Sequence, residues 1–449
     1  MPARKYQDRL GSALIYHEAG KLTKSLGLVY EATLPGAAIG SLCRIHTSHE
    51  RAEDQGIDAE VIGFRDKRVM LMPFEDVRGV NNDSLVVLKK RVSTMSVSQS
   101  LLGRVIDARG FPIDGKGPLI LDGVPHEERG LYQRPSDPLS RERIKDPLSL
   151  GVKAIDGLLT CGKGQRVGVF AGSGVGKSVL LGMMAKNTAA DVNVIALIGE
   201  RGREVREFIE RDLGEEGLRR SVVVVATSDT APLIRMRGAF LATTIAEYFR
   251  DQGQDVLLLM DSVTRFCMAQ REIGLSLGEP PASKGYTPSV FSTLPKLLER
   301  AGTAKDRGSI TGLYTVLVEG DDMDDPIADA ARSILDGHIV LTRRLAERNH
   351  YPAIDVLQSV SRLMSTVATP DQRRHASQIR EWMAVYNQSE DLINIGAYVK
   401  GSNPKIDQAV QLNDRITQFL RQGVEDVVRL PEAQAMMLAI SRAGDAYRS

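Results

Sequence analysis

Few cysteines, few aromatic residues and no excess charge of either sign set the first limits on this chain. Of its 449 residues, 3 are cysteine, 1 is tryptophan and 5% are aromatic, and 58 basic residues balance 57 acidic ones. Cys43, Cys161 and Cys267 lie far apart without the spacing of a zinc site, which favours buried thiols over disulfides or a structural metal. A formal charge of +1 provides no field that would gather nucleic acid, so we expect no nucleic-acid partner.

Long hydrophobic runs are missing as well. No run of about 18 apolar residues occurs, and the N-terminal segment MPARKYQDRLGSALIYHEAG is too poor in apolar residues for a signal peptide. We therefore expect a cytoplasmic chain that neither crosses a membrane nor is secreted. With 42% hydrophobic and 26% charged residues, its composition is typical of a globular protein with two or three domains.

The stretch FAGSGVGKSVLLGMM, residues 170–184, is typical of a phosphate-binding loop (P-loop). An apolar run enters a glycine-rich turn that opens a helix, so backbone N–H groups and a helix N-terminus meet at one point. Lys177 would reach the β- and γ-phosphates of a nucleotide, and the Ser178 hydroxyl would bind Mg²⁺. Ala171 replaces the leading glycine of the motif, and a plain strand-to-helix turn would explain the glycines but not Gly-Lys-Ser. The predicted nucleotide-binding loop comprises Gly172, Ser173, Gly174, Val175, Gly176, Lys177, Ser178 and Val179.

Two acidic residues are candidates for completing this site. Asp261 ends the apolar strand VLLLMD, at the edge where open α/β sheets place their ligands, and would organise Mg²⁺. The next residue is Ser262, whereas many P-loop ATPases carry the water-activating glutamate there, so that group must come from elsewhere. Glu200, in LIGERGREV, is our candidate, with Arg201 beside it to contact phosphate or to orient Glu200. The alternative is that ERGRE is a solvated charge cluster at the start of a helix.

The chain divides into an arm and three domains. Residues 1–24 predict an amphipathic or partly disordered arm, which is either an attachment point or a frayed terminus. Five short apolar segments in residues 25–92 predict a small β-barrel. In residues 93–369, six apolar runs from RVGVF to GHIVLT alternate with helical stretches, which predicts a parallel sheet covered on both faces. Residues 370–449 are polar and predict a C-terminal helical domain.

Several longer stretches resemble the type III protein-export ATPases, relatives of the rotary ATP synthase subunits. They include GQRVGVFAGSGVGKSVLLGMMA, IGERGREVREFIE and DSVTRFCMAQREIGLSLGEPPASKGYTPSVFSTLPKLLERAG, and the resemblance covers roughly residues 25–440. EGDDMDDPIADAARSILDGHIVL distinguishes the export ATPases from the synthase catalytic subunit, whose acidic hinge-helix motif is not found here. The resemblance implies an α/β fold, with a RecA-like P-loop ATPase core between an N-terminal β-barrel and a C-terminal helical domain, and Mg²⁺ with ATP as cofactors.

The resemblance also implies roles for single residues. The family's phosphate, magnesium and water-positioning residues are matched by Lys177, Ser178, Asp261 and Glu200. Arg201 matches the residue beside the water-positioning one in the same motif.

Two further residues are implied by the resemblance. Tyr351, in HYPAIDVLQSVSR, falls where an aromatic residue of the family stacks on adenine; without the family, a packed tyrosine at a strand end would explain it equally well. Arg362 aligns with the arginine finger, which in this family reaches the nucleotide of the adjacent subunit. The resemblance thereby implies a homohexameric ring in which one chain cannot complete its own active site.

The activity implied by the resemblance is ATP hydrolysis in a ring, coupled to chaperone release, unfolding and export of protein substrates. LINIGAYVKGSNPKIDQAV is more similar to flagellar members than to virulence injectisome ATPases, so the flagellar apparatus is favoured and the injectisome stays open. The implied partners are a regulatory stator-like protein at the N-terminal arm, a central stalk protein, membrane proteins of the export gate, and chaperone–substrate complexes. These partners place the ATPase at the inner face of the cytoplasmic membrane.

Other classes of protein stay open at this stage. A hexameric RNA translocase shares the P-loop core but needs a barrel with stacking aromatics, and residues 25–90 hold only Tyr30, Phe64 and Phe74. A rotary ATP synthase subunit and a purely structural ring subunit are further alternatives, and Glu200 together with Arg362 argues against the structural one.

Overall fold

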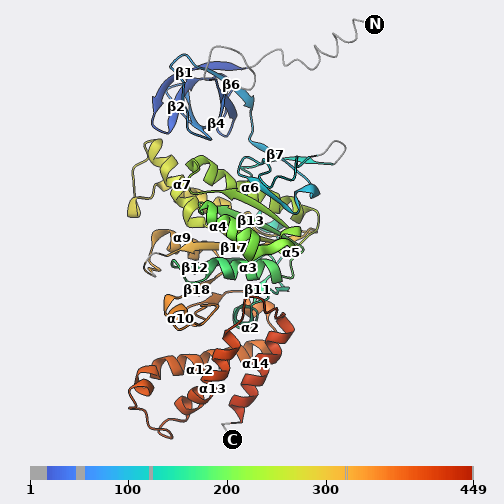
Figure 1. Cartoon of the computed structure of the whole chain (residues 1–449), viewed down its shortest axis with the longest axis vertical. Helices are drawn as coiled ribbons and strands as arrows, with labels where there is room; N and C mark the ends of the chain where they lie inside the picture. The colour runs from blue at the N-terminus through green and yellow to red at the C-terminus, as the bar shows by residue number, and fades with distance from the viewer. Residues whose placement is uncertain (1–17, 47–55, 121–124, 319, 321, 447–449) are drawn as a thin grey trace.

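A barrel, an α/β domain and a helical domain follow one another along the molecule. The computed structural model describes residues 18–46, 56–120, 125–318, 320 and 322–446. The barrel lies at one end, the helical domain at the other, and the α/β domain between them (Figure 1). This arrangement confirms the predicted fold class. Residues 1–17 of the predicted N-terminal arm lie outside the described residues.

The N-terminal barrel is closed and has six strands instead of the five that were predicted. Its strands pair in the order β1-β2-β5-β4-β3-β6. The missed strand, β1, begins at Ala19, so residues 19–24 are part of the barrel and not of an arm. Leu22 is the only buried residue of β1, which explains why the sequence shows no apolar alternation there. The bounds are β1 (Ala19–Leu26), β2 (Val29–Thr33), β3 (Leu42–Ile45), β4 (Ile57–Arg65), β5 (Arg68–Pro73) and β6 (Leu85–Lys90).

The central domain is built on one sheet, in the order β19-β18-β12-β17-β15-β13-β14-β8. All six strands that the sequence predicts are present and run parallel. A short parallel strand, β8, was not predicted, and β19 is antiparallel to its neighbour at the opposite edge. The bounds are β8 (Arg104–Asp107), β12 (Arg166–Ala171), β13 (Val192–Ile198), β14 (Ser221–Ala226), β15 (Val256–Asp261), β17 (Ser309–Leu317), β18 (Gly337–Leu341) and β19 (Val360–Ser361).

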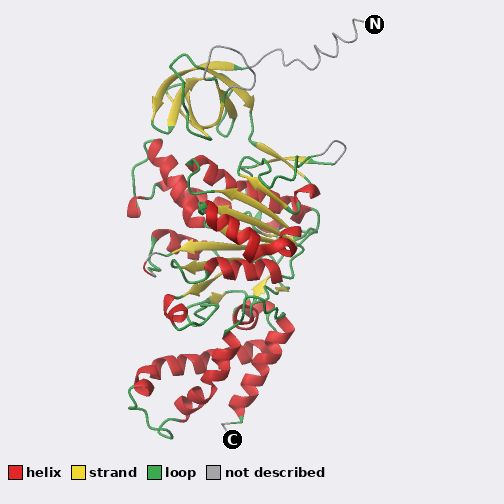
Figure 2. Cartoon of the chain, viewed as in Figure 1, coloured by secondary structure: helices red, strands yellow, loops and turns green. Residues whose placement is uncertain are grey.

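Helices cover both faces of this sheet (Figure 2). Alternate residues of β13 face opposite ways: Val194 packs into one hydrophobic cluster and Ile195 into another. The first cluster includes residues of α6 (Pro232–Asp251), α7 (Val263–Ser276), α8 (Pro288–Leu298) and α9 (Pro326–Ile334). The second includes α3 (Lys177–Asn187) and helices from the C-terminal domain. A sheet buried on both faces explains the continuous Val/Ile/Leu runs of its strands.

The C-terminal domain consists of α12 (Pro370–Asn394), α13 (Pro404–Leu420) and α14 (Leu430–Asp445). Trp382 is 3% exposed and joins the second cluster together with Ile155 and Leu158 of α2 (Lys153–Leu158), so it is a core residue. Among the described residues, no helix has both the length and the apolar composition that a bilayer crossing requires.

Candidate active site

The P-loop lies between β12 and α3, at the carboxyl ends of the parallel strands. Gly174 and Gly176 have φ angles of +78° and +86°, a left-handed conformation that glycine adopts without steric cost. Gly176 directly precedes α3 and has no side chain, so the first N–H groups of the helix stay available for an anion. A Cβ built on Gly174 would meet no atom within 4 Å, so the turn is open on that side. This geometry fits the phosphates of a nucleotide.

The remaining residues of the predicted loop divide between the surface and the core. Ser173 and Ser178 are exposed, whereas Gly172 and Val175 are buried and Val179 is half-buried. The exposed Ser178 lies one residue after Lys177, in the first turn of α3. Its hydroxyl is accessible to a ligand that occupies the loop.

Lys177 lies between two carboxylates. Its Nζ is 2.5 Å from Oδ1 of Asp261 and 3.5 Å from Oε1 of Glu200. Asp261 ends β15, and Glu200 follows β13, the next strand in the sheet. Burial by itself would lower the pKa of Lys177, but the charges of Asp261 and Glu200 hold it above its usual value. The structure therefore brings together three of the predicted site residues, with one positive charge against two carboxyl groups.

The Glu200 carboxyl has an altered proton affinity. Burial first, and then the nearby Asp261 charge, raise its pKa to about 7, although Lys177 acts in the opposite direction. A carboxyl group that titrates near neutral pH is suited to accept a proton from water during catalysis. The predicted role as the water-orienting base therefore fits both its position and its chemistry.

Arg201 does not contact Glu200 directly. Its side chain is 77% exposed, and Nη1 donates to Oε1 of Glu204 at 3.1 Å. Glu204, on α4 (Gly202–Glu207), is in turn a carboxylate that accepts a hydrogen bond from the protonated Glu200 carboxyl. Arg201 is thus connected to Glu200 through Glu204, a residue that the sequence analysis did not single out.

Tyr351 lies beside the P-loop although it is distant in sequence. A Cβ on Gly176 would be 3.5 Å from two ring carbons of Tyr351. The ring is 42% exposed, and the backbone oxygen of Tyr351 accepts a hydrogen bond from the backbone N–H of Gln422 at 3.0 Å. An exposed aromatic face next to a phosphate-binding loop fits a base-stacking position.

Arg362 lies far from this cluster. Its backbone N–H donates to the backbone oxygen of Asp336, and the backbone N–H of Asp336 donates to the backbone oxygen of Arg166, where β12 begins. The P-loop follows the other end of this strand, which has 6 residues and spans about 20 Å. The exposed Arg362 side chain donates to the Arg332 oxygen at 3.1 Å, so it faces away from the nucleotide site of its own chain.

Besides Glu204, two more residues near the cluster were not predicted from the sequence. The Thr315 hydroxyl, on β17, donates to Oδ1 of Asp261 at 2.7 Å. Arg265, in the first turn of α7, packs against Gly199, and its Nη1 lies 3.6 Å from the sulfur of Met268. A hydroxyl in the apolar run SITGLYTVL and an arginine four residues after Asp261 were the available signals.

Within the described residues, no group of three or more His, Cys, Asp or Glu side chains could hold a metal ion by itself. A metal ion beside Ser178 and Asp261 would therefore need further oxygen ligands from a nucleotide and from water. Mg²⁺ is commonly bound in this way, by one or two carboxylates together with substrate phosphates. The oxygen donors that are present thus fit Mg²⁺ carried by a nucleotide.

Comparison with known proteins agrees with this geometry. Residues 151–361 match the ATP synthase alpha/beta family, nucleotide-binding domain, residues 22–88 match its beta-barrel domain, and residues 368–439 match the T3SS EscN ATPase C-terminal domain. The Flagellum-specific ATP synthase of Bacillus subtilis (strain 168) is 52% identical over 95% of this chain and 96% of its own length. The chain belongs to the family of flagellum-specific and type III secretion ATPases.

Other members of this ATPase family are similarly close. The Type 3 secretion system ATPase of Sinorhizobium fredii is 50% identical over 93% of this chain and 91% of its own length. The structure of the assembled ATPase EscN from enteropathogenic E. coli superposes with a TM-score of 0.87 at 48% identity, covering 94% of this chain and 99% of EscN. The predicted family and the predicted ATPase activity are thereby confirmed, and nucleotide binding is a property of the family.

Proposed function

We propose that this chain hydrolyses ATP with Mg²⁺ at the P-loop and, as a homohexameric ring, drives protein export by the flagellar type III apparatus. The observation that carries the proposal is the cluster of Lys177, Asp261 and Glu200 beside an open phosphate-binding turn. In this cluster Lys177 is a cation for the phosphates, Asp261 is a carboxylate that could bind Mg²⁺, and Glu200 is a carboxyl group with a pKa of about 7. These three functions are what phosphoryl transfer to water requires.

Each residue of the P-loop site contributes a separate step. When ATP binds, Lys177 leaves Asp261 and donates to the phosphates, which the N–H groups at the start of α3 also hold. Ser178 and Asp261 would hold Mg²⁺, which neutralises phosphate charge when it is bound. Glu200 accepts a proton from the attacking water, because its buried carboxylate is basic enough at neutral pH.

The supporting residues position the base and the nucleotide. Arg201 holds the Glu204 carboxylate, which accepts a hydrogen bond from Glu200 once Glu200 has taken up a proton. Tyr351 stacks on the adenine, because its exposed ring borders the residue that opens α3.

The position of Arg362 supports a ring. Its backbone lies at the amino ends of β12 and β18, while the P-loop lies at the carboxyl end of β12. An arginine placed there serves the nucleotide of a neighbouring subunit, not that of its own. The structure of assembled EscN, with 48% identity to this chain, supports homo-oligomerisation.

The partners are proposed from the same relatives. EscN has been solved in complex with its central stalk EscO, with a TM-score of 0.85 and 47% identity to this chain, which supports a stalk protein in the pore of the ring. We further assign a stator-like regulator to the N-terminal arm, and chaperone–substrate complexes and export-gate proteins as partners at the inner face of the cytoplasmic membrane. The segment GAYVKGSNP and the flagellum-specific relatives favour the flagellar apparatus over the injectisome.

The RNA-translocase alternative loses support in the barrel. Of the three aromatic residues in residues 25–90, Tyr30 and Phe74 are buried. The Arg237 guanidinium lies over the Phe74 ring, 5.3 Å from its centre. Phe64 is the only one of the three that is exposed. A single exposed ring is too little for a base-stacking surface.

Mixing two inactive variants tests the shared active site. A Glu200→Gln chain has an inactive site but keeps Arg362, and an Arg362→Ala chain keeps its site but has no arginine to provide to its neighbour. Each variant should bind ATP and be nearly inactive alone. In a random equimolar mixture, about a quarter of the interfaces combine an intact Glu200 with an intact Arg362, so hydrolysis should return to roughly that fraction of wild type.

Two further measurements complete this test. Wild-type specific activity should rise with protein concentration as rings assemble, and added RNA should leave it unchanged. Arg374→Ala, at an exposed arginine near the N-terminus of α12, is the matched control and should retain wild-type activity. Concentration-independent activity without recovery on mixing would contradict the ring.

A further inference from the structure

One buried hydroxyl contacts the carboxylate that we assign to magnesium. Thr315 lies near the carboxyl end of β17, the strand between β12, which carries the P-loop, and β15, which ends at Asp261. In the register of the sheet, Thr315 is opposite Val169 of β12, and its predecessor Tyr314 is opposite Met260 of β15. The order of the strands therefore places Thr315 between the two halves of the nucleotide site.

The Thr315 hydroxyl and Lys177 share one oxygen atom. Oγ1 of Thr315 lies 2.7 Å from Oδ1 of Asp261, and Nζ of Lys177 lies 2.5 Å from the same Oδ1. Thr315 is 0% exposed, so water does not replace this hydrogen bond. Its hydroxyl also lies 3.2 Å from the backbone oxygen of Met260, but it has one proton, and a carboxylate is the stronger acceptor.

We propose that Thr315 is a positioning residue, which holds Asp261 in place after Lys177 has moved to the nucleotide. The proposal rests on the proposed function, because it needs Mg²⁺ and ATP at this site. Both contacts are made to Oδ1 of Asp261. The Thr315 hydroxyl therefore holds that oxygen, and the other carboxylate oxygen stays available to Mg²⁺. Once Lys177 donates to the phosphates, Thr315 is, within the part of the chain that the structure describes, the side-chain donor that still orients Asp261.

Packing alone does not explain a hydroxyl at this position. The neighbours of Thr315 in β17 are apolar, and the strand is buried from Ser309 to Val316. Valine has the same shape as threonine and is favoured in buried parallel strands. A threonine is therefore useful here because it donates a hydrogen bond to Asp261.

Replacing the hydroxyl while preserving the shape tests this role. We expect Thr315→Val to fold and to bind ATP in EDTA as the wild type does. The factor by which Mg²⁺ increases the affinity for a fluorescent ATP analogue should be about tenfold smaller than in the wild type. Its kcat should fall roughly ten- to a hundredfold, with a smaller change in KM, because the lost hydrogen bond involves a charged group. Thr315→Ser restores the hydroxyl and should stay within about threefold of wild type in both measurements.

A second threonine of the same strand provides the matched control. Thr311 is 1% exposed, and its hydroxyl accepts from the backbone N–H of Gly164 at 2.9 Å, away from Asp261. Thr311→Val also removes a buried hydroxyl, and it should leave the Mg²⁺ dependence of nucleotide binding at the wild-type value. If Thr315→Val fails to fold, Thr315→Ala compared with Thr315→Ser makes the same test.

Two outcomes would overturn the proposal. The first is a Thr315→Val chain that matches Thr311→Val in Mg²⁺ dependence and in kcat, and the second is a Thr315→Ser chain as impaired as Thr315→Val. Failure of the proposed function looks different, because the wild type itself would then show no Mg²⁺-dependent nucleotide binding.

Discussion

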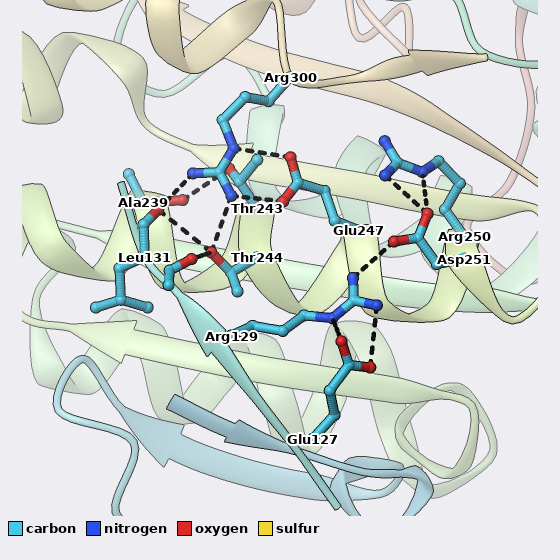
Figure 3. A network of polar contacts seen from close by, with 11 residues as sticks. Glu127, Arg129, Leu131, Ala239, Thr243, Thr244, Glu247, Arg250, Asp251 and Arg300 are labelled. Atoms are coloured by element: carbon cyan, nitrogen blue, oxygen red, sulfur yellow. Dashed lines mark hydrogen bonds and ion pairs between the residues drawn. The ribbon is translucent and has the colours of Figure 1, made fainter. Parts of the chain in front are cut away.

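Two groups of buried charges in the central domain differ in how they are paired. In the network of Figure 3, Arg300 is fully buried and forms a two-pronged ion pair with Glu247, from Nε to Oε1 at 2.8 Å and from Nη2 to Oε2 at 2.6 Å. The same guanidinium also donates to the Leu131 oxygen at 2.6 Å and to the Thr244 hydroxyl at 2.9 Å. Each nitrogen of the Arg300 guanidinium and each carboxylate oxygen of Glu247 therefore has a hydrogen-bond partner.

The cluster at the P-loop is paired incompletely. One ammonium group, Lys177, serves both Asp261 and Glu200, and its distance to Glu200 is 3.5 Å. A planar guanidinium held by several acceptors is locked in place, whereas an ammonium on a flexible stem can exchange one oxygen for another. A buried charge cluster with excess negative charge and an exchangeable cation is thus suited to binding a ligand, whereas a fully matched ion pair is suited to holding helices together.

Removing the exchangeable cation should have the strongest consequence for activity. Lys177→Ala should lower ATP hydrolysis by at least about a thousandfold, because the phosphates lose a positive charge that neutralises them in the transition state. Its thermal unfolding midpoint without nucleotide should remain near that of the wild type, since Glu200 can take up a proton when the ammonium is gone.

Lys186, in the last turn of the same helix, provides the control for this variant. It lies 3.9 Å from the exposed Glu425, and Lys186→Ala should retain activity within about twofold. Normal turnover by Lys177→Ala would remove the distinction between the two clusters.

The fully matched pair should behave in the opposite way. Arg300→Met should reduce the free energy of unfolding by about 3–5 kcal/mol, because it leaves Glu247 buried without its partner. Chemical denaturation measures this loss, and the kcat of the folded protein should change less than about threefold. Adding Glu247→Met should recover much of the stability, since the unpaired charge is then removed as well.

The control for this pair is an ion pair at the surface that includes Asp251, which Figure 3 also shows. Arg307 is 53% exposed and pairs with Asp251 at 2.8 Å, so Arg307→Met should cost at most about 1 kcal/mol. If Arg300→Met instead abolished hydrolysis in a stable protein, the network would be part of the active site.

The smallest expected effect is a dependence of stability on pH. Because the folded-state pKa of Glu200 is raised to about 7, the folded protein binds more protons than the unfolded chain between about pH 4.5 and 7. The contribution of Glu200 to stability is thus present at pH 4.5 and is lost as the pH rises through 7. Relative to wild type, Glu200→Gln should gain on the order of 2 kcal/mol between pH 5 and 8, measured by chemical denaturation without nucleotide.

A gain of the same size at Glu204→Gln would argue against this assignment. Glu204 hydrogen-bonds to Glu200, but its own pKa is lowered despite partial burial, so its stability effect should have the opposite sign. Comparing the two variants at the same pH values separates the two carboxyl groups.

The sequence predicts those parts of the site that depend on neighbouring residues. The turn from Gly172 to Ser178 needs particular φ angles and a helix start, which are set by residues next to one another in the chain. The positions of Asp261 and Glu200 can also be predicted, because each residue comes at the end of an apolar run and the carboxyl ends of parallel strands meet at one edge of a sheet. The roles of Tyr351 and Arg362 came from family resemblance alone.

Other features depend on contacts between distant segments. Strand β1 was not predicted, because it buries only Leu22 and so shows no apolar alternation. Its place in the barrel is fixed by backbone pairing with β2 and β6. The pairing of Arg300 with Glu247 arises where the end of α8 packs on α6, and local sequence patterns carry no information about such partners.

The order of the strands in the sheet also depends on contacts between distant segments. Motifs along the chain identify β12 and β15 as the strands of the nucleotide site, but β17, later in sequence than both, is inserted between them. That insertion brings the Thr315 hydroxyl to Asp261 and makes a threonine in an apolar run part of the site. The physical reason is that strand order is set by how the whole sheet and its helices bury their apolar area. That area is a sum over the domain and cannot be calculated from any single segment of the sequence.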